Sequence, residues 1–191
     1  ILVSGSQTMY EGFTTTKRLH IIGERTGPLS VSTVVRTDID FAEVFNDVDP
    51  NHLRHAGGSI LESIETTGTA RVLIRGACTG VTIKRCTLPE VANNPNVLLI
   101  GCSGALIQNS VIAWISNSTG SAAGIQVRGA GNSVVGSWVR RIVLGNSESY
   151  LVENSVLGHY VGGGAQTTGP ISTTADAVPF TIRNTIILGK T

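Results

Sequence analysis

Trp114, Arg141, His159 and Glu90 are residues of the types that bind sugars, and they stand at matched positions in the sequence. An indole ring stacks on a sugar ring, whereas charged side chains form hydrogen bonds with hydroxyl groups and acidic substituents. Each of the four follows an aliphatic position of a repeat, described below, at the same distance of seven residues. We expect the four side chains to lie near one another and to contact a glycan. The alternative is that they are ordinary residues at the edges of loops.

Basic residues form a second group of glycan-contact candidates. Arg75 and Arg128 would face outward from one strand of the repeat, and Lys84 from another. Positive charge there would suit the carboxylates of uronic acids. Hydrolysis of a glycosidic bond instead needs two carboxyl groups about 5 to 9.5 Å apart. Glu153 and Glu90 have no carboxylate partner in a neighbouring repeat, so we predict no catalytic residue.

Neither the acidic residues nor the cysteines predict a metal or another cofactor. The segment Asp47–Asn51 is similar to the start of a calcium-binding loop, but the glycine and the later glutamate of an EF-hand are absent. His52 and His55 follow it in a polar stretch, where we expect them to be solvated. The cysteines lack the C-x2-C spacing of a zinc site. We expect three small buried apolar residues at Cys78, Cys86 and Cys102.

Composition argues against several classes of function. Charged residues make up 14% of the chain, the net charge is +1, and aromatic residues make up 5%. Neither the charge nor the aromatic content suits nucleic-acid binding. No apolar run approaches the roughly 18 residues of a membrane-spanning helix. Glycine is abundant, with 23 residues, and Asn, Ser, Thr, Val and Ile fill much of the remainder. We therefore predict a β-rich protein that binds no nucleic acid and does not insert into a membrane.

A repeat in the second half of the chain must position the candidate residues. Each stretch has an aliphatic residue, then Arg, Asn or Gly two positions later, then Cys, Ser or Thr at the third. The stretches are VTIKRCTL, ALIQNSVI, SVVGSWV, YLVENSVL and FTIRNTII, aligned on Ile83, Ile107, Val134, Val152 and Ile182. In a second column, residues two positions before a glycine are Ile74, Leu99, Val127 and Val143. Each unit is therefore expected to hold two short strands, a bend marked by glycine and a variable loop.

Strands this short cannot form a stable sheet within one unit. Units stacked about 4.8 Å apart would let each strand pair with the strands above and below it. We therefore predict an all-β right-handed parallel β-helix of about six to eight coils, in a single domain over residues 1–191. Asn109, Asn154 and Asn184 are predicted to form a ladder of buried amides that hydrogen-bond along the stack. A β-sandwich is the alternative, but it would not predict aligned Asn and Gly columns.

The chain resembles the pectin lyase-like right-handed β-helix superfamily. Residues 1–24, ILVSGSQTMYEGFTTTKRLHIIGE, are similar to the first coil of these proteins, and the I-x-N-S-x-I units are similar to their repeat. The resemblance covers about two thirds of the chain, and it is more specific for the fold than for activity. The superfamily includes polysaccharide lyases and hydrolases, epimerases, phage tailspikes and structural proteins of virions or cell surfaces.

Two segments depart from the repeat. Asp40–Glu43 has the spacing of a capping box, so we expect a short helical turn or a protruding loop near residues 36–60. The small polar residues of 162–178 predict a flexible flap. Apolar strands at both ends of the chain predict a covering segment, which a neighbouring subunit or further sequence would supply.

These observations favour a structural or glycan-contacting component of a larger surface assembly. The resemblance points above all to a virion protein, tailspike-like or capsid-decorating, and a fragment of an adhesin would share the fold. Such a protein would be extracellular or on the virion surface. It would form a homo-oligomer, such as a trimer, or contact neighbouring subunits, and it could bind polysaccharide. The alternative is a polysaccharide lyase or glycoside hydrolase acting on an acidic glycan. Its sugar groove would place Arg75, Arg128, Lys84 or Arg141 beside a carboxylate.

Overall fold

The chain forms parallel β-sheets. The computed structural model describes residues 1–5, 8–24, 33–46, 49–67, 70–75, 78–88, 97–100, 102–112, 125–127, 131–140, 142–144, 150–158, 171–173 and 180–188. Across these residues the regular secondary structure is β-strand throughout, with no helix. All strand pairs are parallel apart from one hairpin. The prediction of an all-β protein with parallel strands is therefore confirmed.

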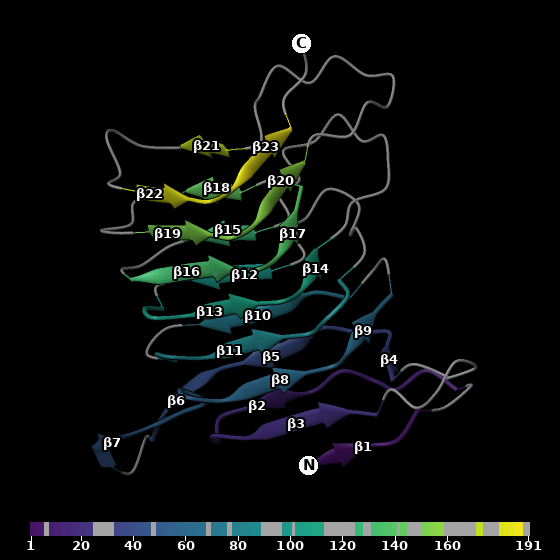
Figure 1. The fold of residues 1–191 in the computed structure, drawn as a ribbon. Helices are drawn as coiled ribbons and strands as arrows, with labels where there is room; N and C mark the ends of the chain where they lie inside the picture. The colour runs from purple at the N-terminus through teal and green to yellow at the C-terminus, as the bar shows by residue number, and fades with distance from the viewer. Residues whose placement is uncertain are drawn as a thin grey trace.

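Two long sheets run along the molecule from near the N-terminus to near the C-terminus, and a third begins partway along it at β14 (Figure 1). The eight-stranded sheet contains, in order, β1 (Leu2–Val3), β3 (His20–Gly23), β8 (Ile60–Glu62), β11 (Thr82–Lys84), β13 (Leu106–Gln108), β16 (Asn132–Val135), β19 (Tyr150–Glu153) and β22 (Phe180–Arg183). The seven-stranded sheet contains β2 (Thr14–Thr15), β5 (Ile39–Phe41), β10 (Val72–Arg75), β12 (Val97–Ile100), β15 (Ile125–Val127), β18 (Ile142–Leu144) and β21 (Ile171–Thr173). The four-stranded sheet contains β14 (Val111–Ile112), β17 (Trp138–Val139), β20 (Val156–Gly158) and β23 (Ile186–Leu188).

The chain visits these sheets in a fixed order. From the seven-stranded sheet it enters the eight-stranded sheet and then the four-stranded sheet, as in the succession β12, β13, β14. The two-stranded sheet of β4 (Val34–Val35) and β9 (Glu65–Thr66) continues the four-stranded sheet toward the N-terminus. Isolated bridges at Thr87 connect Glu65 of β9 to Val111 of β14. One passage through the three sheets is called a unit below. Successive units place residues that are far apart in sequence directly beside one another.

The predicted alignment of the first column is confirmed by the register of the eight-stranded sheet. Ile83 pairs with Ile107, which pairs with Val134, and the series continues to Val152 and Ile182. Side chains alternate between the faces of a strand, so one aliphatic residue per strand points inward. From Ile83 to Val152 these residues are at most 1% exposed and belong to one hydrophobic cluster.

The second column is confirmed in part. Ile74 pairs with Leu99 as predicted. Val127, however, pairs with Leu144 rather than with Val143. The predicted register was therefore wrong by one residue there, and a slip of one residue moves every side chain to the opposite face. Ile142, two residues before Leu144, is buried, which fixes the inward face of that strand.

The structure differs from the prediction at Asn109, Asn154 and Asn184. Their side chains are exposed, and their φ values are +49°, +50° and +45°. This left-handed backbone costs an ordinary L-residue roughly 1–2 kcal/mol, but asparagine and glycine tolerate it. Arg85 and Gly136 occupy the same position in their units, with φ of +54° and +59°. The asparagines recur because the units from β8 to β22 turn the same left-handed corner out of the eight-stranded sheet, and not because buried amides stack.

The corner that leads into the eight-stranded sheet is also left-handed. Gly80, Gly104 and Gly131 lie there with φ between +65° and +68°, which glycine adopts without steric cost. The glycines singled out in the sequence, Gly76, Gly101, Gly129 and Gly145, lie outside the described residues.

The first predicted insertion protrudes, as one of its two predicted forms would, and the flap predicted over residues 162–178 lies largely outside the described residues. Asp40 and Phe41 lie in β5, where Phe41 is fully buried, so the helical turn suggested by the capping-box spacing is wrong. β6 (Glu43–Asn46) and β7 (Asp49–His55) instead form the antiparallel hairpin, which projects from the side of the stack in Figure 1. Within the second segment, Ile171–Thr173 form β21 of the seven-stranded sheet, and residues 162–170 and 174–178 lie outside the described part.

Candidate functional site

Glu62 places a carboxylate on the outer side of the eight-stranded sheet. Leu61 points into the core and is fully buried, so the next residue of β8 faces outward. The Glu62 side chain is nevertheless only 6% exposed, because neighbouring side chains cover it. A buried carboxylate is costly unless it is paired and hydrogen-bonded.

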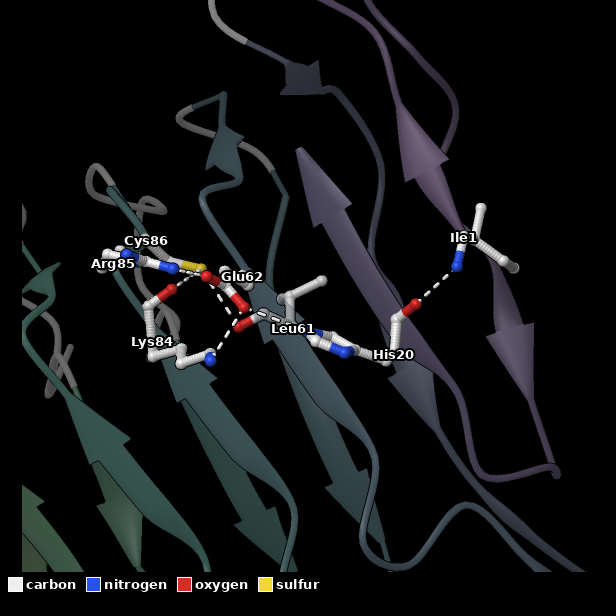
Figure 2. Close-up of polar contacts among 7 residues, drawn as sticks. All are labelled: Ile1, His20, Leu61, Glu62, Lys84, Arg85 and Cys86. Carbon is white, nitrogen blue, oxygen red and sulfur yellow. Dashed lines mark hydrogen bonds and ion pairs between the residues drawn. The ribbon is translucent and has the colours of Figure 1, made fainter. Parts of the chain in front are cut away.

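Three basic side chains surround this carboxylate (Figure 2). The Lys84 Nζ atom lies 2.8 Å from Oε2 of Glu62, and the His20 Nε2 atom lies 3.0 Å from the same oxygen. The Arg85 guanidinium forms an ion pair with Oε1. Lys84 and Arg85 approach Glu62 from one side, whereas His20 approaches from the other. These four residues are called the Glu62 cluster.

The register of the sheet brings the cluster together. Glu62 of β8 pairs directly with Lys84 of β11, and both side chains therefore lie on the same face. His20 lies on β3, on the opposite side of β8, and its partner in the register is Ile60. Arg85 is at the left-handed corner just after β11. Four residues from three parts of the chain thus meet because three successive units are stacked.

The charges of the cluster do not cancel. Glu62 carries one negative charge, whereas Lys84 and Arg85 carry two positive charges, and His20 is a further basic side chain. The three basic side chains are 29%, 61% and 45% exposed, in the order Lys84, Arg85, His20. Solvent therefore meets an excess of positive charge above a covered carboxylate. Such a surface suits anions. In the described part of the chain, no group of three or more His, Cys, Asp or Glu residues could hold a metal ion.

Lys84 was among the residues predicted from the sequence, whereas its partners Glu62 and His20 were not. The signal was present, because Leu61, Glu62 and Ser63 repeat the pattern of Ile83, Lys84 and Arg85 one unit earlier. Ser63 also has the left-handed backbone of that corner, with φ of +56°. The stretch escaped alignment because Ile64 stands where later units have Cys, Ser or Thr.

Of the predicted glycan-contact residues, the structure describes Lys84, which belongs to the Glu62 cluster, and Arg75. The Nε atom of Arg75 lies 3.0 Å from Oδ1 of Asp40, and the Arg75 side chain is 48% exposed. A neighbouring pair, directly before β10 and β5, joins Arg71 to Asp38 with 2.6 Å between the closest atoms, and this hydrogen bond raises the pKa of Arg71. Both acidic partners are thus already engaged. The remaining candidates, Glu90, Trp114, Arg128, Arg141 and His159, lie outside the described residues.

The three cysteines are buried free thiols, as predicted. Burial raises the pKa of the Cys86 thiol to about 11 and that of the Cys102 thiol to about 12. The Cys86 thiol donates to the carbonyl oxygen of Lys84 at 3.3 Å, beneath the Glu62 cluster. A protonated, covered thiol is a poor nucleophile and a poor metal ligand. These side chains therefore belong to the core.

Comparison with models of protein families, with curated proteins and with solved structures finds no match to this chain. Among the described residues, no helix is long and apolar enough to cross a membrane.

Proposed function

We propose that the three sheets are the walls of a right-handed parallel β-helix, and that the chain serves as a rigid structural segment of a larger surface assembly. The unbroken register of the eight-stranded sheet supports this most directly, because each strand pairs with the strand of the next unit from β1 to β22. Parallel crossovers between strands of one sheet are right-handed in about 98% of cases, which supports the handedness.

The assembly would be extracellular, with a virion surface as the leading candidate. Large apolar side chains are exposed in the terminal strands: Leu2 is 69% exposed, and Ile186, Ile187 and Leu188 are 49% to 59% exposed. Exposed apolar side chains beside unpaired strand edges favour association. Further copies, as in a trimer, neighbouring subunits or further sequence would cover them. Polysaccharide would contact the sides of the stack.

A polysaccharide lyase or hydrolase acting on an acidic glycan is the second candidate. Lys84 and Arg85 lie beside Glu62, and Arg75 lies beside Asp40, which is the pairing that this alternative requires. Structural use is favoured because Glu62, Asp40 and Asp38 are held in ion pairs between units. A carboxylate that joins neighbouring units is engaged in stabilising the stack.

Incubation of the protein with a panel of neutral and acidic polysaccharides tests the two functions. Binding would be followed by biolayer interferometry, and turnover by reducing ends and by the ultraviolet absorbance of unsaturated products. The structural function predicts no turnover of any polysaccharide, whether or not one binds. Release of unsaturated or reducing products would overturn it in favour of the enzyme, and Lys84→Gln and Arg75→Gln would then locate the activity.

A further inference from the structure

We infer that Lys84, Arg85 and His20 form a binding site for a tetrahedral oxyanion, a phosphate or sulfate group, on the solvent side of Glu62. This site does not depend on the role proposed above, since it rests on the geometry of the Glu62 cluster alone. Phosphate and sulfate groups are matched to it by charge and by their number of acceptor oxygens.

The excess of positive charge is the first reason. A single cation would neutralise the carboxylate of Glu62, yet Lys84 and Arg85 both contact it and His20 lies 3.0 Å from it. Cations held this close repel one another unless a further anion is present. Because the carboxylate is covered and the cations are exposed, the second anion would bind from solvent.

Unused hydrogen-bond donors are the second reason. A guanidinium group has five N–H donors and an ammonium group has three, and one carboxylate engages only some of them. The Arg85 side chain is 61% exposed, so part of its planar fork faces solvent. A tetrahedral oxyanion offers three or more acceptors to donors that arrive from different strands, whereas a carboxylate ligand offers two oxygens.

The backbone of Arg85 is the third reason. Its φ of +54° is unfavourable for a side chain of this type, whereas the same corner carries Asn109, Gly136, Asn154 and Asn184 in later units. Non-glycine residues held in left-handed conformations are concentrated at functional sites. The preceding unit carries Ser63 at this corner, so among the described units Arg85 alone places a charged side chain there.

Isothermal titration calorimetry with sodium phosphate and with sodium sulfate, at constant ionic strength set by sodium chloride, tests the site. We expect saturable binding of at least one of the two anions. Arg85→Asn removes the charge and installs the residue that later units use at this corner, so the fold should be kept. It should weaken binding about tenfold or more, as the loss of a charge-assisted hydrogen bond would.

Two further variants make the result specific. Lys84→Gln places in β11 the residue that β13 carries at the paired position, Gln108, and it should also weaken binding. Arg183→Gln changes the net charge by the same one unit, but on β22, far along the sheet, and it should leave binding unchanged. Equal weakening by Arg85→Asn and Arg183→Gln would overturn the site in favour of a general charge effect. The absence of saturable phosphate or sulfate binding to the unaltered protein would overturn it as well.

Discussion

The backbone N–H of Ser110 donates a hydrogen bond of 3.1 Å to the hydroxyl oxygen of Ser137, which lies in the next unit of the stack. The hydroxyl of Ser137 donates in turn to the carbonyl oxygen of Val135 at 3.0 Å, and the N–H of Ser137 donates to the hydroxyl of Ser155 at 3.2 Å. Equivalent bonds run from Cys86 to Ser110 and from Ser155 to Thr185. A column of buried hydroxyls, rather than of amides, therefore connects the units beside the left-handed corner.

Ser137→Ala should destabilise the protein by about 1–3 kcal/mol. The substitution leaves the buried N–H of Ser110 without its acceptor, and an unsatisfied buried donor carries that cost. Urea unfolding followed by circular dichroism measures the change in free energy of unfolding. The matched control is Ser4→Ala, which removes an exposed hydroxyl and should leave stability unchanged. Equal stability of the two variants would contradict the role of the hydroxyl column.

Asn154→Leu should destabilise the protein, whereas Asn154→Gly should not. Leucine in a left-handed backbone costs roughly 1–2 kcal/mol, whereas glycine adopts it freely. The free energy of unfolding should therefore fall for leucine and stay equal or rise for glycine. A ladder of buried amides would instead lose hydrogen bonds in both variants, so a loss of stability in Asn154→Gly would restore that interpretation.

Glu62→Gln should destabilise the protein by about 1–3 kcal/mol, because the hydrogen bonds that a buried carboxylate accepts from charged groups are lost or weakened. Lys84 and Arg85 would then repel each other without a counter-charge. Glu153→Gln is the control, since Glu153 lies in the same outward column of the sheet but only partly buried. Thermal unfolding at low and high salt should show a larger loss for Glu62→Gln at both. Identical losses would mean that the cluster contributes nothing specific.

Stability should fall in alkaline solution as the buried thiols titrate. The thiol pKa of Cys86 is about 11 in the folded protein, above the ordinary value of 9.0. The unfolded chain therefore loses its proton first as the pH rises, and stability present below pH 9 declines up to about pH 11. Urea unfolding as a function of pH measures this decline. Cys86→Ser places at this position the serine that later units carry, and it should make the decline in stability smaller. An unchanged dependence of stability on pH would contradict the assignment of the decline to the Cys86 thiol.

The aliphatic columns could be predicted from the sequence because burial imposes them. Ile83, Ile107 and Val134 fill one inward position in successive units, and only apolar side chains are stable there. The column of asparagines was equally visible, but its cause was not. An asparagine satisfies both a buried amide ladder and an exposed left-handed corner, so the residue type alone could not distinguish the two.

Local signals were misleading where pairing between distant segments decides the structure. Asp40–Glu43 has the spacing of a helix cap, yet Phe41 is fully buried between β2 and β10, and this burial outweighs the cap. The meeting of His20 with Glu62 could not be predicted for a related reason. The members of the Glu62 cluster stand on or directly after β3, β8 and β11, and their proximity depends on the register of units whose connecting segments vary in length.

Native mass spectrometry of the protein recovered from its source tests the proposed role as a structural segment of an assembly most directly. A rigid stack with exposed apolar side chains in its terminal strands should be found with further copies of itself or with other subunits. The account predicts a mass equal to several copies, or to one copy plus a partner, which persists on dilution. A protein that is monomeric at every concentration would contradict it.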